Sequence, residues 1–239
     1  VRVSPKYVFC FLIAISGLLV MFHILGQVSR LGFGHAQLHG LVPLFDLEEE
    51  TNVPSFWSSC LWLVAGSIAW FAAYRARRDA RRDWPHWSGL SIIFYSFGMD
   101  ETIQFHERMG GFLVRFLQIE WIRPTGFVYY VWTIPALIFA LVVFFVYLRF
   151  LMALPRDVMR LMVVAGVVFV TGPVGFELLE GPIDEAGGYM NLLYTVYVTC
   201  EETLEMAGVC ILILALLRYV AVRSPNFQVA VGDTQPPTN

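Results

Sequence analysis

Six long apolar stretches constrain the fold of this chain more than any other feature. About 20 consecutive apolar residues cross a bilayer as an α-helix. Stretches of that length lie at about 7–28, 55–75, 86–106, 126–150, 158–180 and 189–220. Hydrophobic residues occupy 57% of the 239 positions, charged residues occupy 15%, and the mean hydropathy is +0.64. The sequence therefore predicts an all-α, polytopic integral membrane protein with six transmembrane helices.

Basic residues gather in the loops on one side of these predicted spans. The loop 75–83 carries five arginines, and Arg149, Arg156 and Arg160 flank the next loop on that side. Short loops rich in arginine stay in the cytoplasm. Because the number of spans is even, we expect N- and C-termini that are both cytoplasmic, in a bacterial-type plasma membrane. The basic loops should contact anionic lipid headgroups of the lipid bilayer, and nucleic acid is not an expected partner.

The apolar stretches are predicted to form one unit. A six-helix transmembrane domain over 1–223 precedes a proline-rich, polar tail, 224–239, which we expect to be a disordered cytoplasmic segment. Lys6 is the only lysine and precedes the first span, so the buried Schiff base of a retinal pigment is excluded. The spacing of the four cysteines indicates neither a disulfide framework nor a zinc site.

Acidic residues lie in the half of the spans that is remote from the arginine-rich loops. A rise of about 1.5 Å per residue puts acids from separate helices at a similar depth. A carboxylate in hydrocarbon costs about 2.5–3.5 kcal/mol, so such residues mark a functional site. The candidate site residues are Asp100, Glu101, His106, Glu177, Glu180, Glu201 and Glu205.

Helical spacing predicts which of these side chains share a face. Glu201 and Glu205 are four residues apart and lie on one side of the last span, whereas Glu202 should point about 100° away. In the fifth span, Gly172-Pro173 predicts a kink just below Glu177.

Three further expectations concern helix ends and a loop. The spacing of Asp100, Gln104 and Glu107 predicts one polar stripe at the end of the third span. Gly181-Pro182 predicts that the fifth helix ends near Glu180. The acids at 48–50 are expected in an exposed loop above the second span.

Converging carboxylates need a counter-charge, which either protons or a cation can provide. Hard cations take oxygen ligands, and iron, manganese and zinc accept carboxylate together with imidazole. We therefore expect a divalent metal ion. If the protein is an enzyme, this ion would activate water or oxygen for attack on an amphiphilic substrate from the bilayer. Its expected ligands are Glu101, His106, Glu177, Glu201 and Glu205, supported by Asp100 and Glu180.

Two alternatives use other features of the sequence. Intramembrane acids and the break at Gly172-Pro173 also fit a proton- or cation-coupled transporter, although no second acidic layer continues toward the cytoplasm. The third possibility is a non-catalytic accessory subunit of a membrane complex, in which His23 binds a pigment or haem.

Overall fold

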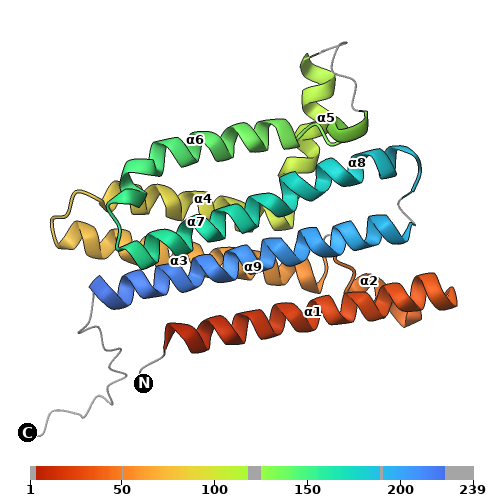
Figure 1. Ribbon diagram of the computed structural model, residues 1–239, viewed down its shortest axis with the longest axis horizontal. Coiled ribbons are helices and arrows are strands. Elements are labelled where there is room, and N and C mark those ends of the chain that lie inside the picture. The colour runs from red at the N-terminus through yellow and green to blue at the C-terminus, as the bar shows by residue number, and fades with distance from the viewer. Residues whose placement is uncertain (1–3, 50, 118–124, 189–190, 224–239) are drawn as a thin grey trace, which may run out of the picture.

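Long helices run side by side along the molecule in the computed structural model (Figure 1), which describes residues 4–49, 51–117, 125–188 and 191–223. No strand occurs in these ranges. The long helices are α1 (Pro5–Phe33), α3 (Val53–Arg78), α4 (Trp84–Ile103), α6 (Thr133–Met152), α7 (Arg156–Val170) and α9 (Leu192–Arg223). The short ones are η1 (Leu38–Gly40), α2 (Leu41–Leu44), α5 (Phe105–Leu117), η2 (Gly126–Val128), η3 (Thr171–Phe176) and α8 (Glu177–Glu185). The all-α prediction is confirmed for this part of the chain, and the predicted tail 224–239 lies outside it.

Five helical segments of the described chain are long and apolar enough to cross a membrane, judged by length and composition. They are α1, α3, α6, α9 and the continuous run Arg156–Glu185 that joins α7 to α8. The predicted third span corresponds to α4, which has 20 residues but is not among the five. The fold is therefore compatible with a multi-pass membrane protein.

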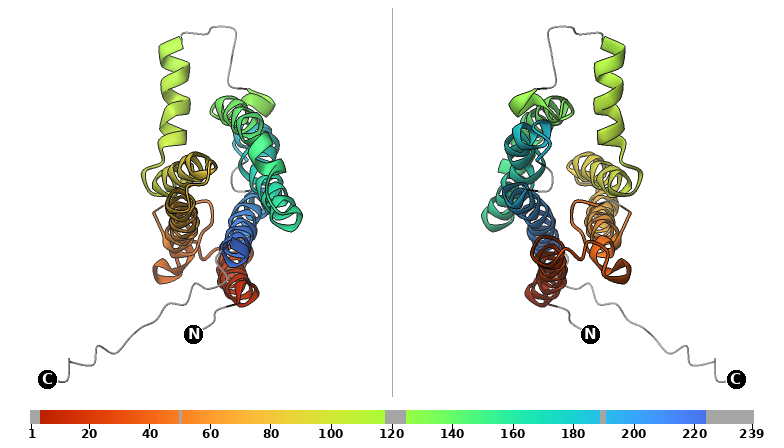
Figure 2. Two further views of the ribbon diagram at one scale, coloured as in Figure 1. Left: turned by 90° about the vertical axis from the view of Figure 1, so that its left-hand side faces the viewer. Right: turned by 90° about the vertical axis from the view of Figure 1, so that its right-hand side faces the viewer.

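The helices form two layers that diverge from one edge (Figure 2). One layer contains α3 and α4, and the other contains α1, α9, α7 and α6 in that spatial order. Contacts between α3 and α9 join the two layers. At the opposite edge, α4 and α6 lie further apart, and the site described below occupies the space between them.

Small and hydroxyl residues bring α3 and α4 together. A Cβ atom on Gly98 would lie 3.1 Å from the Cβ of Trp62, so the glycine permits close approach. Ser59 Oγ donates to the carbonyl oxygen of Gly98 at 2.6 Å, and Ser91 Oγ donates to that of Gly66 at 2.8 Å. Glycine and serine at such positions are typical of helix pairs in membranes, where backbones pack closely.

The polar stripe predicted at the end of the third span is wrong, because the helix breaks there. Gln104 adopts a left-handed conformation with φ 53°, which ends α4 and starts α5 in a new direction. Figure 1 shows α5 standing across the long helices. The carboxylate of Asp100 accepts the backbone N–H of His106 at 3.1 Å and so stabilises the first turn of α5. The side chain of Glu107 lies outside the described part of the chain.

The break predicted at Gly172-Pro173 takes the form of a π-helical turn, η3. Proline lacks an N–H group and cannot complete the regular hydrogen-bond ladder, so the extra residue of a π-turn fits there. The predicted helix end near Glu180 is wrong, because α8 continues to Glu185 with Pro182 inside. A Cβ on Gly181 would lie 2.6 Å from the carbonyl oxygen of Gly126, so packing against η2 holds this segment in place.

An aromatic cluster closes the gap between α4 and α6 at the end that carries the arginine-rich loop. The rings of His86 and Phe150 stack with centroids 5.0 Å apart, and Trp87 meets Phe150 edge-on at 5.0 Å. Trp87 Nε1 also donates to the hydroxyl of Tyr219 on α9 at 3.0 Å. The space between the layers is therefore closed by rings at this end.

Candidate functional site

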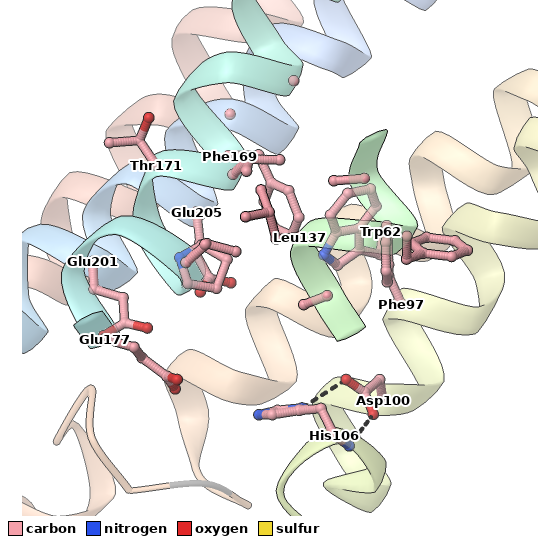
Figure 3. Close-up of a pocket in the computed structure, with 18 of the residues that line it drawn as sticks. Trp62, Phe97, Asp100, His106, Leu137, Phe169, Thr171, Glu177, Glu201 and Glu205 are labelled. Atoms are coloured by element: carbon pink, nitrogen blue, oxygen red, sulfur yellow. Dashed lines mark hydrogen bonds and ion pairs between the residues drawn. The ribbon is translucent and has the colours of Figure 1, made fainter. Parts of the chain in front are cut away.

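A cavity of about 1370 Å³ lies between the two layers (Figure 3). It exceeds the roughly 300–1,000 Å³ of ordinary small-molecule sites. Apolar side chains from four helices cover most of its surface, among them Phe97 on α4, Leu137 on α6, Phe169 on α7 and Leu212 on α9. The cavity therefore suits a large ligand with a substantial apolar part.

The cavity extends far along the long helices. Its lining on α4 runs from Leu90 to Ile103, and its lining on α9 runs from Tyr194 to Leu212. At about 1.5 Å per residue, these runs cover about 20 Å and about 27 Å along their helices. The hydrocarbon core of a bilayer is about 30 Å thick. The cavity is thus long enough for an extended hydrocarbon chain.

The π-helical turn brings two acidic segments together on one wall. Gly172 in η3 packs so closely on α9 that a Cβ would lie 2.8 Å from the carbonyl oxygen of Glu201 and 2.9 Å from Cγ of Glu205. The same turn leads directly into α8, which carries Glu177 and Glu180. These four side chains form the acidic wall of the cavity, part of which Figure 3 shows.

Two members of the acidic wall are almost completely buried. Glu180 is 3% exposed and Glu201 is 7% exposed. The two carboxyl groups are close enough to interact within this wall. Atom Oε1 of Glu180 is buried without a hydrogen-bond partner among the described residues. Such an orphan acceptor costs free energy, which makes this atom a candidate contact for a bound ligand.

Asp100 and His106 form a pair on the facing wall (Figure 3). Asp100 Oδ2 lies 2.7 Å from His106 Nδ1, and the ring of His106 lies 4.5 Å, between centroids, from that of Trp132. In Figure 3 the imidazole extends from Asp100 into the cavity, toward Glu177. A carboxylate that holds one imidazole nitrogen orients the ring for proton transfer at the other, as in acid–base catalysts.

All seven residues predicted for the site line this cavity. They are Asp100, Glu101, His106, Glu177, Glu180, Glu201 and Glu205. Glu202, which helical spacing places about 100° away from Glu201, is also among the residues that line the cavity. Within the described residues, no group of three His, Cys, Asp or Glu side chains is arranged to hold a metal ion. Metal binding by these residues therefore stays a prediction.

The outer rim of the cavity contains residues that the sequence did not single out. The hydroxyl of Tyr130 donates to Asp184 Oδ2 at 2.9 Å and lies 3.5 Å from that of Tyr194. Tyr194 also hydrogen-bonds to the carboxyl group of Glu48, which lines the cavity. Glu48 lies in an exposed loop, as the sequence predicts, and lines the cavity from there. Withdrawal from bulk water raises the pKa of Glu48, although the hydrogen bond from Tyr194 opposes the rise.

His23 is buried, with both ring nitrogens occupied. Nε2 lies 3.1 Å from Thr199 Oγ1, and Nδ1 accepts the backbone N–H of Leu47 at 2.9 Å. Asp46 Oδ1 lies 3.1 Å from the same Nδ1. The side chain is 2% exposed. This arrangement holds the loop after α1 against α9, and it gives the pigment or haem hypothesis no support.

The fold and the site together define an all-α chain that is compatible with a multi-pass membrane protein, and its described helices surround a large apolar cavity with an acidic end. The chain belongs to the family described as "Domain of unknown function (DUF8692)", which matches residues 10–220. No curated protein and no solved structure matches the chain. The function is therefore argued from the cavity itself.

Proposed function

We propose that this chain is a six-span membrane protein that takes an amphiphilic molecule from the bilayer into its cavity. The single observation that carries the proposal is the cavity of about 1370 Å³, apolar along its length and acidic at one end. The apolar chains of the ligand would lie between α4, α6 and α7. Its polar end would lie between the acidic wall and the pair formed by Asp100 and His106.

The orientation in the membrane follows from the charge and the arrangement of the helices. The start of α1, the end of α9 and the loop 75–83 lie at one end of the molecule (Figure 1). The positive-inside rule assigns this end to the cytoplasm, and its arginines to anionic lipid headgroups. The five candidate spans are completed to six by α4, the third in chain order, whose Asp100 and Glu101 line the cavity. The acidic wall then lies in the outer half of the bilayer.

Access from the bilayer is supported by the loose attachment of α6. This helix packs against α7 and η3, and its large side chains Phe145 and Val146 are 66% and 63% exposed. Its contact with α4 includes Tyr147 near the closed end and Phe139, whose ring centroid lies 6.2 Å from that of Phe97. An amphiphile would enter between α4 and α6 with its chain leading inward.

A cavity-filling substitution tests the proposal. Gly166 lines the cavity, and no atom of the described residues lies within 4 Å of a Cβ at this position. Gly166→Phe should therefore place a ring in the cavity and lower the amount of lipid-like ligand that co-purifies with the protein, measured by mass spectrometry of an organic extract. The matched control is Gly17→Phe on α1, where space is also open but which does not line the cavity. Equal ligand content in wild type and both variants would refute the proposal.

A divalent metal ion at the acidic wall is the second candidate, favoured by the four carboxylates gathered there. Their side chains would have to close around the ion, because no described group of three is arranged as ligands. Elemental analysis of protein purified in detergent without chelator tests this. We expect about one ion per chain, lost in Glu201→Gln and kept in Glu49→Gln, which alters an exposed loop acid. Folded wild-type protein without metal would contradict this candidate.

The transporter hypothesis gains no support from the cavity. The inner half of the cavity is lined by apolar residues such as Leu90, Met162 and Leu212, and the aromatic cluster around Phe150 closes this end. A proton or metal ion would find no polar path there among the described residues. Ion flux measured in proteoliposomes would support the transporter hypothesis if Glu205→Gln abolished it.

A further inference from the structure

The charged residues that line the cavity, among those the structure describes, are acidic. Nine acidic residues line it, whereas no lysine or arginine occurs among the described lining residues and His106 is the one histidine. The acids are Glu48, Asp100, Glu101, Glu177, Glu180, Asp184, Glu201, Glu202 and Glu205. Phosphate, sulfate and carboxylate groups are normally bound by arginine, lysine or helix N-termini. The lining therefore disfavours an anionic head group.

The buried acceptor on Glu180 adds a second, independent requirement. This side chain is 3% exposed, and its atom Oε1 has no hydrogen-bond partner in the described part of the chain. A ligand that satisfies this atom must donate a hydrogen bond. An alkylammonium group carries N–H donors, a positive charge and no acceptor. It can therefore balance the negative charge of the lining and donate a hydrogen bond to Oε1 of Glu180.

Aromatic rings lie close to the same end of the cavity. Trp132, Tyr130 and Tyr194 line it together with the acids, and the ring of Trp132 packs on that of His106. Faces of tryptophan and tyrosine attract cations within about 6 Å of the ring centroid. Aromatic rings beside carboxylates thus favour a cationic head group over a neutral one.

We infer that the amphiphile bound by this cavity is an amine, whose protonated N–H-bearing head group contacts Glu180 at the acidic wall while its hydrocarbon chain lies between α4, α6 and α7. The inference rests on the proposed function, because it assumes that an amphiphile enters the cavity. It goes further by specifying the charge and the hydrogen-bonding character of the head group.

Four probes of equal chain length separate the possibilities. Dodecylamine, dodecyltrimethylammonium, dodecanol and dodecanoate are added to the detergent-purified protein after chelation, because a metal ion would compete for the same carboxylates. Binding is followed through the fluorescence of Trp62 and Trp132, which line the cavity. We expect dodecylamine to bind at least about tenfold more tightly than each of the other three, because only it combines the positive charge with N–H donors.

Two variants test whether Glu180 causes the preference for dodecylamine over the other probes. Glu180→Gln removes the negative charge and should abolish the preference for dodecylamine while dodecanol binding is retained, which also shows that the variant is folded. The control is Glu49→Gln, at an exposed acid that does not line the cavity, and it should keep the full preference.

The outcomes distinguish failure of the inference from failure of the proposed function. If none of the four probes binds, the amphiphile proposal fails and the inference fails with it. If all four bind with similar affinity, or if dodecyltrimethylammonium binds as tightly as dodecylamine, the cavity does bind amphiphiles but the inference is overturned. Retention of the amine preference in Glu180→Gln would likewise overturn the assignment to this residue.

Discussion

Two equally buried carboxyl groups differ in whether their oxygens have hydrogen-bond partners. Asp46 and Glu180 are each 3% exposed. Asp46 Oδ1 accepts a hydrogen bond from Gln27 Nε2 at 2.9 Å, and Oδ2 lies 3.4 Å from Arg30 Nη1. Glu180 has the carboxyl group of Glu201 as its neighbour, and one of its oxygens has no hydrogen-bond partner among the described residues. The satisfied acid serves the structure of the loop after α1, whereas the unsatisfied one lies in the proposed binding site.

The pH dependence of stability should report on Asp46. Burial alone would raise the pKa of this carboxyl, but hydrogen bonds from the backbone N–H of Glu48 and from Gln27 Nε2 bring it below its ordinary value of 3.8. A lowered pKa stabilises the folded state above pH 3.8, and this contribution is lost as the pH falls through the folded-state value.

The measurement is the melting temperature of purified protein as a function of pH. Asp46→Asn should lower stability at neutral pH by about 1.5–3 kcal/mol, the usual range for hydrogen bonds to a charged group. Its melting temperature should also fall less steeply than that of wild type below pH 4. Parallel curves for the two proteins over this range would contradict the role assigned to Asp46.

The contact between α7 and α9 determines where the acidic residues lie. A Cβ on Gly208 would come within 2.8 Å of the backbone nitrogen of Phe169 and within 2.9 Å of its Cα. Backbone atoms cannot move aside as a flexible side chain can. Together with Gly172, this glycine lets α9 lie directly against α7 and η3, and the position of Glu201 and Glu205 beside α8 depends on it.

Gly208→Ala should therefore separate α7 from α9. The expected loss of stability is about 1–3 kcal/mol, the range for overpacking a close contact. Gly166→Ala on α7 is the control, since nothing lies within 4 Å of a Cβ there and alanine forms helices better than glycine. Thermal unfolding in detergent compares the two. A Gly208→Ala variant as stable as Gly166→Ala would show that the helices do not pack this closely.

The elements differ in how far their sequences predict them. The apolar stretches predict α1, α3 and α9 well, because a run of that length favours one structure. The break at Gln104 is invisible in the pattern, since helical spacing continues from Asp100 to Glu107 and glutamine carries no turn signal. What ends α4 is the Asp100 carboxylate, which binds the next segment's backbone N–H at 3.1 Å and competes with the regular helix.

For the whole molecule, the sequence predicts the layer of acids but not the cavity. The acids from α4, α8 and α9 share a depth because helical rise is fixed, so their convergence follows from counting residues. The volume between the layers depends on how α4 and α6 diverge, which side-chain packing decides. Tyr130 and Glu48 join the site through contacts with Tyr194 and Asp184 over long sequence separations, and no local pattern encodes these.

The last prediction concerns the orientation of the whole molecule, because the acidic wall can face the outer leaflet only if the arginine-rich end is cytoplasmic. In a background without native cysteines, Ala80→Cys marks the loop between α3 and α4, and Ala186→Cys marks the exposed end of α8. A membrane-impermeant maleimide added to right-side-out vesicles should label Ala186→Cys, and Ala80→Cys only after permeabilisation. Six spans place these sites on opposite sides of the membrane. Labelling of both sites in sealed vesicles would mean that α4 does not span, and the cavity would then open to water rather than to lipid.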